Sequence, residues 1–135
     1  MEELKFHRES IYKLTININP NNATGPDNIT GKILKENINI CSDILIIIFT
    51  KSIQSGKVPP DWNHASVTSV FTKRDKHHPG NYRPISLTCF SCKLLEHILA
   101  GNMMKHLEST NILFELQHGF RANGSSESQI ISLIH

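Results

Sequence analysis

Prolines place the strongest limit on what this chain can fold into. The sequence holds six prolines, and all of them lie between positions 20 and 84. Because proline lacks a backbone N–H and collides with the preceding helical turn, it ends helices and is confined to the edges of sheets. Turns are therefore expected around these prolines, whereas the residues after position 84 are free to form a long helix.

Hydrophobic spacing predicts helices before position 58. Two short ones are expected near residues 2–14 and 29–36. The aliphatic run Ile44–Phe49 fits either a buried strand or a buried helix by periodicity alone. Flanking chemistry favours the helix, since Ser42 is a suitable N-cap and Gly56 a suitable C-terminal stop.

A β-hairpin is predicted next. Residues 65–71 are rich in β-branched side chains, and residues 82–87 can return as a second strand with Pro84 at an edge. The intervening residues 72–81 are polar and contain Pro79-Gly80, which is a turn signal.

A long helix from about Cys89 to Glu108 should follow, with Thr88 as its cap. Its apolar stripe comprises Leu94, Leu95, Ile98, Leu99, Met103 and Leu107. Ser126 and Gln129 offer a capping box for a further helix, in which the chain ends. The expected fold class is α+β, mostly helical with one antiparallel β-hairpin.

Composition excludes several classes of protein. With 39% hydrophobic and 19% charged residues, the chain is neither a disordered tail nor a coiled-coil rod. No apolar run approaches the ~20 residues that span a bilayer, and no secretory signal follows Met1. Three cysteines, an odd number, argue for a reducing compartment. We expect an intracellular protein without a membrane partner, in the nucleus or the cytoplasm.

Positive charge is concentrated in the middle of the chain. The formal net charge is +2, yet residues 51–83 carry six Lys or Arg against two Asp. A local basic segment suggests phosphate or nucleic acid as the partner. The alternative is a solvated loop whose lysines serve solubility.

Several segments stand in a characteristic order. They are Ala23-Thr24-Gly25-Pro26-Asp27, Ser55-Gly56-Lys57-Val58-Pro59-Pro60-Asp61-Trp62, Asn81-Tyr82-Arg83-Pro84-Ile85-Ser86-Leu87-Thr88, Lys93-Leu94-Leu95-Glu96 and Gln117-His118-Gly119-Phe120-Arg121. From about Lys13 onward, this order and spacing resemble the N-terminal part of the reverse transcriptase domain of non-LTR (LINE-type, jockey-like) retrotransposons. The family usually has Gly at position 28, Pro at position 69 and Lys-Lys-Gly-Asp at positions 72–75, where this chain differs.

The resemblance implies that residues 1–135 form a partial reverse transcriptase domain, the fingers portion of a right-hand polymerase without its palm core. The implied partners are an RNA template, a DNA primer, a deoxynucleoside triphosphate and the missing palm and thumb. In the family the catalytic aspartates lie downstream of the Gly-Phe-Arg segment, which here places them beyond His135. We therefore expect no cofactor in this piece, although Mg²⁺ is implied for the complete enzyme, and no RNA-directed DNA polymerase activity from the chain alone.

The aspartates of this chain support the same expectation. They stand at predicted turns or caps and are never adjacent: Asp27, Asp43, Asp61 and Asp75. Two-metal phosphoryl transfer requires clustered carboxylates. The sequence thus offers no catalytic residue and no metal site.

Arg83 is the leading candidate for a contact with nucleotide phosphate. Its guanidinium is permanently charged and directs two donors onto phosphate oxygens. Lys73 stands on the outgoing side of the hairpin, and Arg74 takes its role if the register shifts by one residue. The resemblance implies that this hairpin folds over the incoming nucleotide. The alternative is an arginine that shields the hairpin backbone.

Gly119, Phe120 and Arg121 are candidate template contacts. A flexible backbone, a ring that can stack and a cation suit close approach to a nucleic-acid strand. Phe120 is equally suited to anchor a core.

Two other functions remain open from the sequence. One is a non-catalytic nucleic-acid-binding remnant of a degenerate element copy. The other is a small redox or zinc module built on the pair Cys89-x-x-Cys92.

Overall fold

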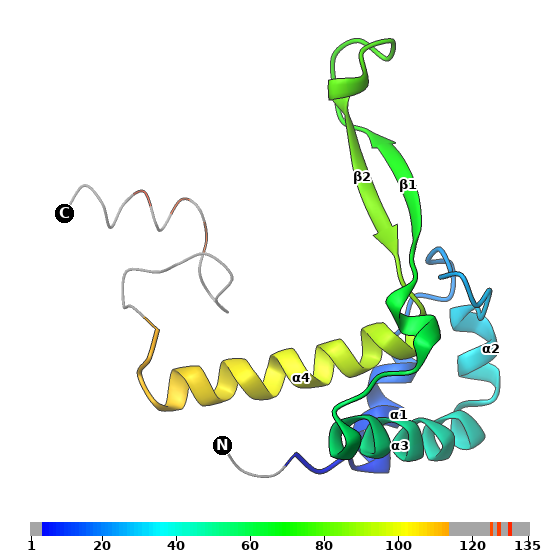
Figure 1. Cartoon of the computed structure of the whole chain (residues 1–135), viewed down its shortest axis with the longest axis vertical. Coiled ribbons are helices and arrows are strands. Elements are labelled where there is room, and N and C mark those ends of the chain that lie inside the picture. Colours follow the sequence, from blue (N-terminus) through cyan, green and yellow to red (C-terminus); the bar gives the residue numbers. More distant parts are fainter. Residues whose placement is uncertain (1–3, 114–124, 126, 128–129, 131–135) are drawn as a thin grey trace. The chain divides into compact units, whose positions relative to one another are not determined.

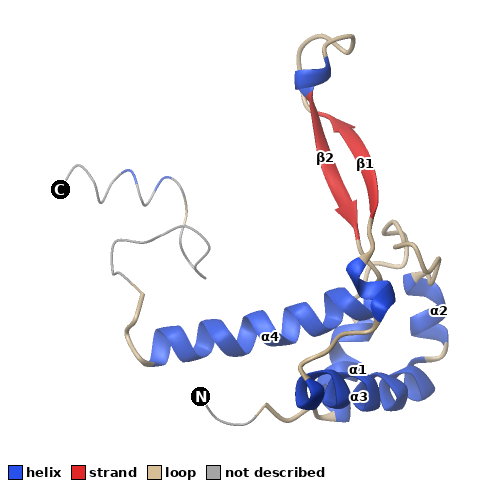
Figure 2. Cartoon of the chain, viewed as in Figure 1, coloured by secondary structure: helices blue, strands red, loops and turns tan. Residues whose placement is uncertain are grey.

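The structure is a computed structural model that describes residues 4–113, 125, 127 and 130 (Figures 1 and 2). In chain order the elements are α1 (Arg8–Ile16), α2 (Gly31–Glu36), α3 (Ile38–Ser55), the 3-10 helix η1 (Pro60–Asn63), β1 (Ser66–Phe71), the 3-10 helix η2 (Pro79–Asn81), β2 (Tyr82–Leu87) and α4 (Phe90–Ser109). The chain divides into two compact units, and the boundary lies within α4. The first unit is Glu2–Ile98, and the second begins at Leu99. Helices together with a two-stranded antiparallel sheet agree with the predicted α+β class.

A small apolar core holds α1 against α3 in the first unit. Ile11 and Phe49 are fully buried, and Leu45 is nearly so. The Phe49 ring lies 5.6 Å from the ring of Phe6 and 6.0 Å, edge-on, from that of Trp62. Tilted and edge-to-face contacts of this kind are the favoured arrangements of aromatic pairs. Trp62, placed by the two prolines before it, therefore closes the core from η1.

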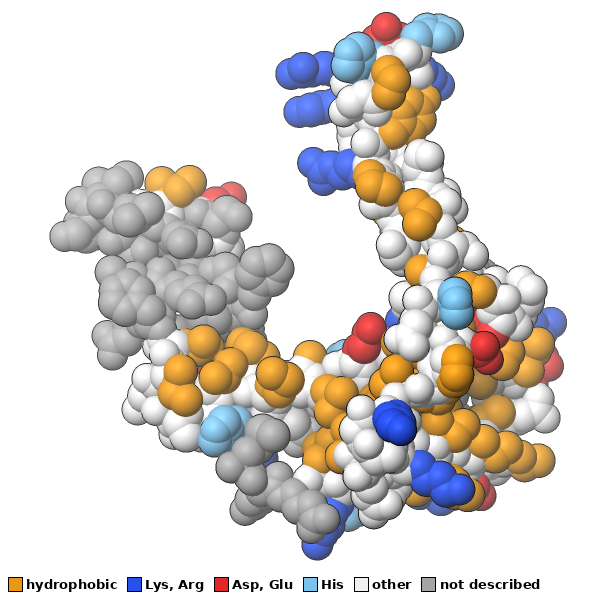
Figure 3. All heavy atoms as spheres, in the orientation of Figure 1, with side chains coloured by type: hydrophobic (Ala, Val, Ile, Leu, Met, Phe, Trp, Pro, Cys, Tyr) orange, Lys and Arg blue, Asp and Glu red, His pale blue; other side chains and the backbone are white. Residues whose placement is uncertain are grey.

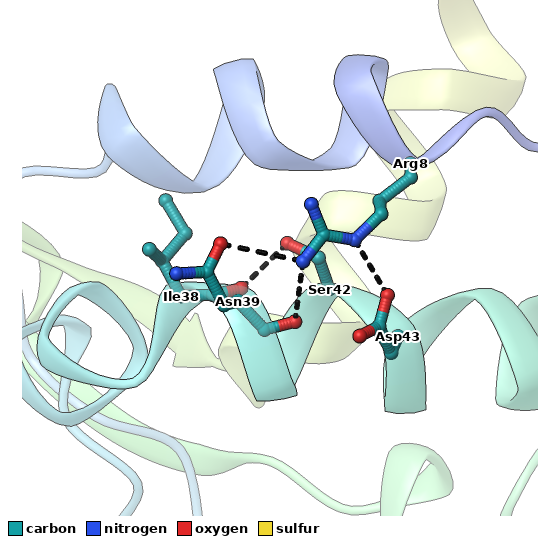
Figure 4. A network of polar contacts seen from close by, with 5 residues as sticks. All are labelled: Arg8, Ile38, Asn39, Ser42 and Asp43. Atoms are coloured by element: carbon teal, nitrogen blue, oxygen red, sulfur yellow. Dashed lines mark hydrogen bonds and ion pairs between the residues drawn. The ribbon is translucent and has the colours of Figure 1, made fainter.

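A polar network joins the same two helices at the surface (Figure 4). Arg8 Nε donates to Asp43 Oδ1 at 2.6 Å, and its Nη2 lies 3.3 Å from both the backbone and the side-chain oxygen of Asn39. Both charged side chains are about half exposed, so the ion pair contributes no more than ~1 kcal/mol. The network serves mainly to set the pairing of α1 with α3.

The start of α3 differs from the sequence prediction. The helix begins at Ile38, immediately after α2, and Ser42 lies one turn inside it rather than capping it. Ser42 is buried, and its hydroxyl donates to the Ile38 carbonyl at 2.7 Å, which satisfies the hydroxyl within the helix. The C-terminal prediction is confirmed, because Gly56 caps α3 with a left-handed φ of 65°.

α3 also leaves an apolar face uncovered. Ile40, Ile44 and Ile47 are each about half exposed or more. Among the described residues, α3 alone is long and apolar enough to cross a membrane by length and composition. Core helices of globular proteins satisfy the same criterion, so it carries little weight by itself.

The Gly25-Pro26-Asp27 segment packs on the junction between β2 and α4. A Cβ on Gly25 would lie 2.5 Å from Cys89 N and 2.6 Å from Thr88 C, so only glycine fits there. The Asp27 carboxylate accepts a hydrogen bond from Ile29 N at 3.2 Å. This segment is therefore a structural clasp that positions the base of the hairpin.

The hairpin itself is a two-stranded ribbon. β1 and β2 pair antiparallel from Ser66↔Leu87 to Phe71↔Tyr82. β2 has the predicted bounds, and β1 starts one residue later than predicted. The strand residues between the first and last pairs are all exposed, with Val67 at 68%. Because such a ribbon is marginally stable in water, its shape depends on how its base and tip are held.

α4 starts at Phe90, with Lys93 N donating to the Cys89 carbonyl, so the helix begins beyond the predicted Thr88 cap. Only its first half buries apolar side chains, including Leu94 and Leu95. Met103, in the second unit, is 56% exposed. The predicted capping box at Ser126 and Gln129 lies outside the described residues.

The close packing of Gly25 on the backbone of Thr88 and Cys89 can be tested by substitution. Gly25→Ala should destabilise the first unit by about 1–3 kcal/mol, since its methyl group would overlap rigid backbone. Gly101→Ala is the control, because Gly101 lies in α4 with nothing within 4 Å of the added carbon. Urea denaturation followed by Trp62 fluorescence should show a lower midpoint for Gly25→Ala alone. Equal midpoints for the two variants would contradict the clasp.

Candidate phosphate-binding hairpin

Four cations gather at the far end of the hairpin. Lys73, Arg74 and Lys76 belong to the loop between the strands, and Arg83 is the second residue of β2. All four are exposed, and Figure 3 shows Lys and Arg side chains projecting from the hairpin into solvent. Within the described part of the chain, the side chains of Lys73, Arg74 and Arg83 make no hydrogen bond or ion pair, so their charges are available to a ligand.

Some of the other cations have an ion-pair partner close by in the structure. Lys13 pairs with Glu9 at 2.7 Å within α1, and Arg8 pairs with Asp43. The acidic residue of the tip, Asp75, is engaged differently, because its Oδ1 accepts from His77 N at 2.9 Å in a local turn. The hairpin end thus retains an excess of positive charge.

The strand register shows on which face of the ribbon the Arg83 side chain lies. Arg83 pairs with Val70, so its side chain shares a ribbon face with Thr68 and Ile85. Among the described residues, no backbone carbonyl accepts a hydrogen bond from its guanidinium. The alternative, an arginine that shields the hairpin backbone, stays a prediction that the Arg83 variants described below test.

The loop between the strands is closed at its base. Thr72 donates to the Asn81 carbonyl with both its backbone N, at 2.9 Å, and its Oγ1, at 2.7 Å. Further along, Gly80 N donates to Nδ1 of His78 at 3.2 Å. These bonds make the loop an ordered continuation of the ribbon, from which Lys73 and Arg74 project.

Two departures from the family pattern coincide with unusual backbone. Asn28 has a φ of 56° and Arg74 a φ of 76°, which is the left-handed region that favours glycine. The resemblance implies Gly at both positions. Asn tolerates this conformation, whereas an ordinary side chain such as that of Arg74 incurs about 1–2 kcal/mol of strain.

The template candidates Gly119, Phe120 and Arg121 lie outside the described residues. Their proposed contact with a nucleic-acid strand stays a prediction.

The Cys89-x-x-Cys92 pair shows little sign of metal or redox chemistry. Both side chains are buried as free thiols. Burial raises the pKa of Cys89, as does its hydrogen bond to Asp27. Burial and a 3.4 Å hydrogen bond to Glu96 raise the pKa of Cys92 to about 11. Both redox exchange and zinc binding need the thiolate. Among the described residues, no three His, Cys, Asp or Glu side chains lie close enough together to hold a metal ion.

Sequence reasoning missed the residues that shape the loop. Asp75, Asn81 and Tyr82 bond within it, yet none was assigned a role beyond the motif that contains Asn81 and Tyr82. The available signal was position, since Asn81 and Tyr82 directly precede Arg83. Hydrogen bonds across a loop of this length leave no periodic pattern to detect.

Comparison with known proteins points in one direction. No family model matches the chain. It is 26% identical over 111 residues to the probable RNA-directed DNA polymerase from transposon X-element of Drosophila melanogaster, covering 82% of this chain and 12% of that protein. It is 27% identical over 123 residues to the probable RNA-directed DNA polymerase from transposon BS of the same organism, covering 90% and 13%. The chain thus spans about an eighth of the length of these relatives, and the similarity supports a relationship to transposon RNA-directed DNA polymerases.

The thiol environments give a second test. At pH 7.5 iodoacetamide should alkylate the half-exposed Cys41 well before Cys92, because the raised pKa keeps the Cys92 thiol protonated. The Cys92 rate should climb as the pH approaches 11. Peptide mass spectrometry after timed quenching would measure this, with urea-unfolded protein as the control in which all three cysteines react. Equal rates for Cys41 and Cys92 in the folded protein would contradict the assignment.

Proposed function

We propose that the chain is part of the reverse transcriptase of a non-LTR retrotransposon, corresponding to the fingers portion of that RNA-directed DNA polymerase. In this proposal the hairpin binds the phosphates of the incoming deoxynucleoside triphosphate. The observation that carries it is the unpaired positive charge of Lys73 and Arg74 in the hairpin loop and of Arg83 on β2. The similarity to two transposon polymerases over most of the chain supports the same assignment.

The chemistry of the ligand matches the side chains. A triphosphate carries several negative oxygens, and catalysis of phosphoryl transfer depends mainly on positioning and on neutralising that charge. Arg83 supplies a planar, bidentate donor, and Lys73 or Arg74 supplies a second cation from the tip. Gly119, Phe120 and Arg121 extend the proposal to the template strand on the strength of the resemblance.

The described residues do not fit the metal ion of such an enzyme. Three of the aspartates are engaged elsewhere: Asp27 by Ile29 N, Asp43 by Arg8 and Asp75 by His77 N. No cluster of three potential ligands exists in the described part of the chain. The proposal therefore gives this chain a binding role. In the proposal, the palm, the thumb and Mg²⁺ are parts of the complete polymerase, and the RNA template and DNA primer bind to that complete enzyme.

One observation favours a second candidate, a nucleic-acid-binding remnant of a degenerate copy. Arg74 stands where the resemblance implies Gly, and its φ of 76° lies in the left-handed region that favours glycine, so this departure from the family pattern costs stability. A remnant would retain phosphate binding without polymerase activity. Primer extension by a polymerase completed with a relative's palm separates the two: extension supports the enzyme, and its absence despite nucleotide binding supports the remnant.

Arginine 83 gives the direct test of nucleotide binding. Arg83→Ala should weaken binding of a fluorescent dATP by about tenfold, because a charge-assisted bidentate contact is lost. Arg83→Lys should recover part of the affinity, since it keeps the charge without the fork. Lys13→Ala removes one charge from α1 and should leave the affinity unchanged.

Fluorescence anisotropy and melting temperature should be measured on the same variants. If Arg83→Ala lowers the melting temperature while the Kd for dATP stays constant, Arg83 is structural and the proposal fails. An equal loss of affinity in Lys13→Ala would also contradict it, since binding would then be spread over the surface.

A further inference from the structure

Two side chains that directly precede Arg83 bond across the tip loop. Asn81 Nδ2 donates to the Asp75 carbonyl at 2.8 Å, and the Tyr82 hydroxyl donates to the Lys76 carbonyl at 2.9 Å. The two acceptors are consecutive residues on the opposite arm of the loop. The start of β2 is thereby bonded to the loop segment that carries Lys73, Arg74 and Lys76.

The same tyrosine also fixes the loop through its ring. The rings of Phe71 and Tyr82, the last cross-strand pair, lie 5.5 Å apart in a tilted arrangement. Lys76 Nζ lies 5.7 Å from the centroid of the Phe71 ring, within the range of a cation–π contact. Lys76 is therefore held at both ends, by Tyr82 at its carbonyl and by Phe71 at its ammonium. We name Phe71, Lys76, Asn81 and Tyr82 the tip brace.

The tip has reasons to need such a brace. Lys73, Arg74 and Lys76 stand within four residues of one another, so their charges repel at low ionic strength. The positive φ of Arg74 adds backbone strain in the same segment. A loop free of the brace would relax toward more extended conformations, and a ligand would have to order it again on binding.

We infer that Asn81 and Tyr82 are positioning residues for polyphosphate, which hold the loop that carries Lys73 and Arg74 in a preformed arrangement at the end of the ribbon that carries Arg83. This inference rests on the proposed function, because it concerns the same site. Neither residue carries a charge, so their contribution comes from geometry. Preorganisation improves affinity by avoiding the ordering of side chains and loop during binding.

The sharpest variant is Tyr82→Phe, which removes only the hydroxyl bond to Lys76 and keeps the ring on Phe71. It should weaken fluorescent dATP binding by about three- to tenfold, as expected for one lost hydrogen bond within a site. Asn81→Ala should act in the same direction. Tyr12→Phe on α1, another half-buried tyrosine, is the matched control and should bind like the original chain.

The salt dependence of binding separates positioning from charge. Tyr82→Phe should weaken affinity by a similar factor at every salt concentration, because it removes no charge, whereas Arg83→Ala should also reduce the slope of log Kd against log salt. Hydrogen exchange at the amides of Lys73 to Lys76 should accelerate in Tyr82→Phe. A purely structural tyrosine would lower the melting temperature and leave the Kd of the folded protein unchanged.

Each remaining outcome decides a different claim. If Arg83→Ala weakens dATP binding and Tyr82→Phe and Asn81→Ala do not, Asn81 and Tyr82 are not positioning residues. The proposed function then stands. If the unmodified chain fails to bind dATP at low salt, the proposed function fails and this inference fails with it.

Discussion

The close approach of Gly25 to the backbone of Thr88 and Cys89 is the contact on which the hairpin depends. Among the residues that the structure describes, none forms a layer on either face of the β1–β2 ribbon, so these residues give it no orientation through a larger sheet or a core of its own. Its base is set by the glycine, by the Asp27 carboxylate beside it and by the buried start of α4. A motif that looks from sequence like a simple turn therefore acts as the mount for the candidate site.

The other end of the ribbon is organised by polar contacts and one aromatic pair. Thr72 closes the loop on the Asn81 carbonyl, and Tyr82 reaches over it to Lys76. The loop therefore combines order with unneutralised charge, two properties that oppose each other unless specific bonds hold the cations in place. That combination is what a binding element for polyphosphate requires, and it distinguishes the hairpin from Lys13 and Arg8, whose charges are paired on the helices.

Local chemistry explains which parts of the fold were predictable. Pro79-Gly80 after a segment rich in β-branched residues located the hairpin to within a residue, and Gly56 located the end of α3. The start of α3 was missed because Asn37 ends α2 and begins α3 without a side-chain cap. For the site, Arg83, Lys73 and Arg74 could be selected from charge and spacing, whereas the brace depends on bonds across a loop. The left-handed φ of Arg74 likewise has no signal in an unaided sequence, since arginine does not favour that conformation.

The central claim is that the hairpin end is a localised phosphate site, and NMR titration of the labelled chain with dATP tests it most directly. A localised site gives saturable amide shift changes concentrated between Thr72 and Arg83, with α1, α2 and α3 unaffected. Shift changes of similar size at the lysines of the helices, such as Lys32 and Lys51, would show diffuse attraction to a basic surface and would contradict it.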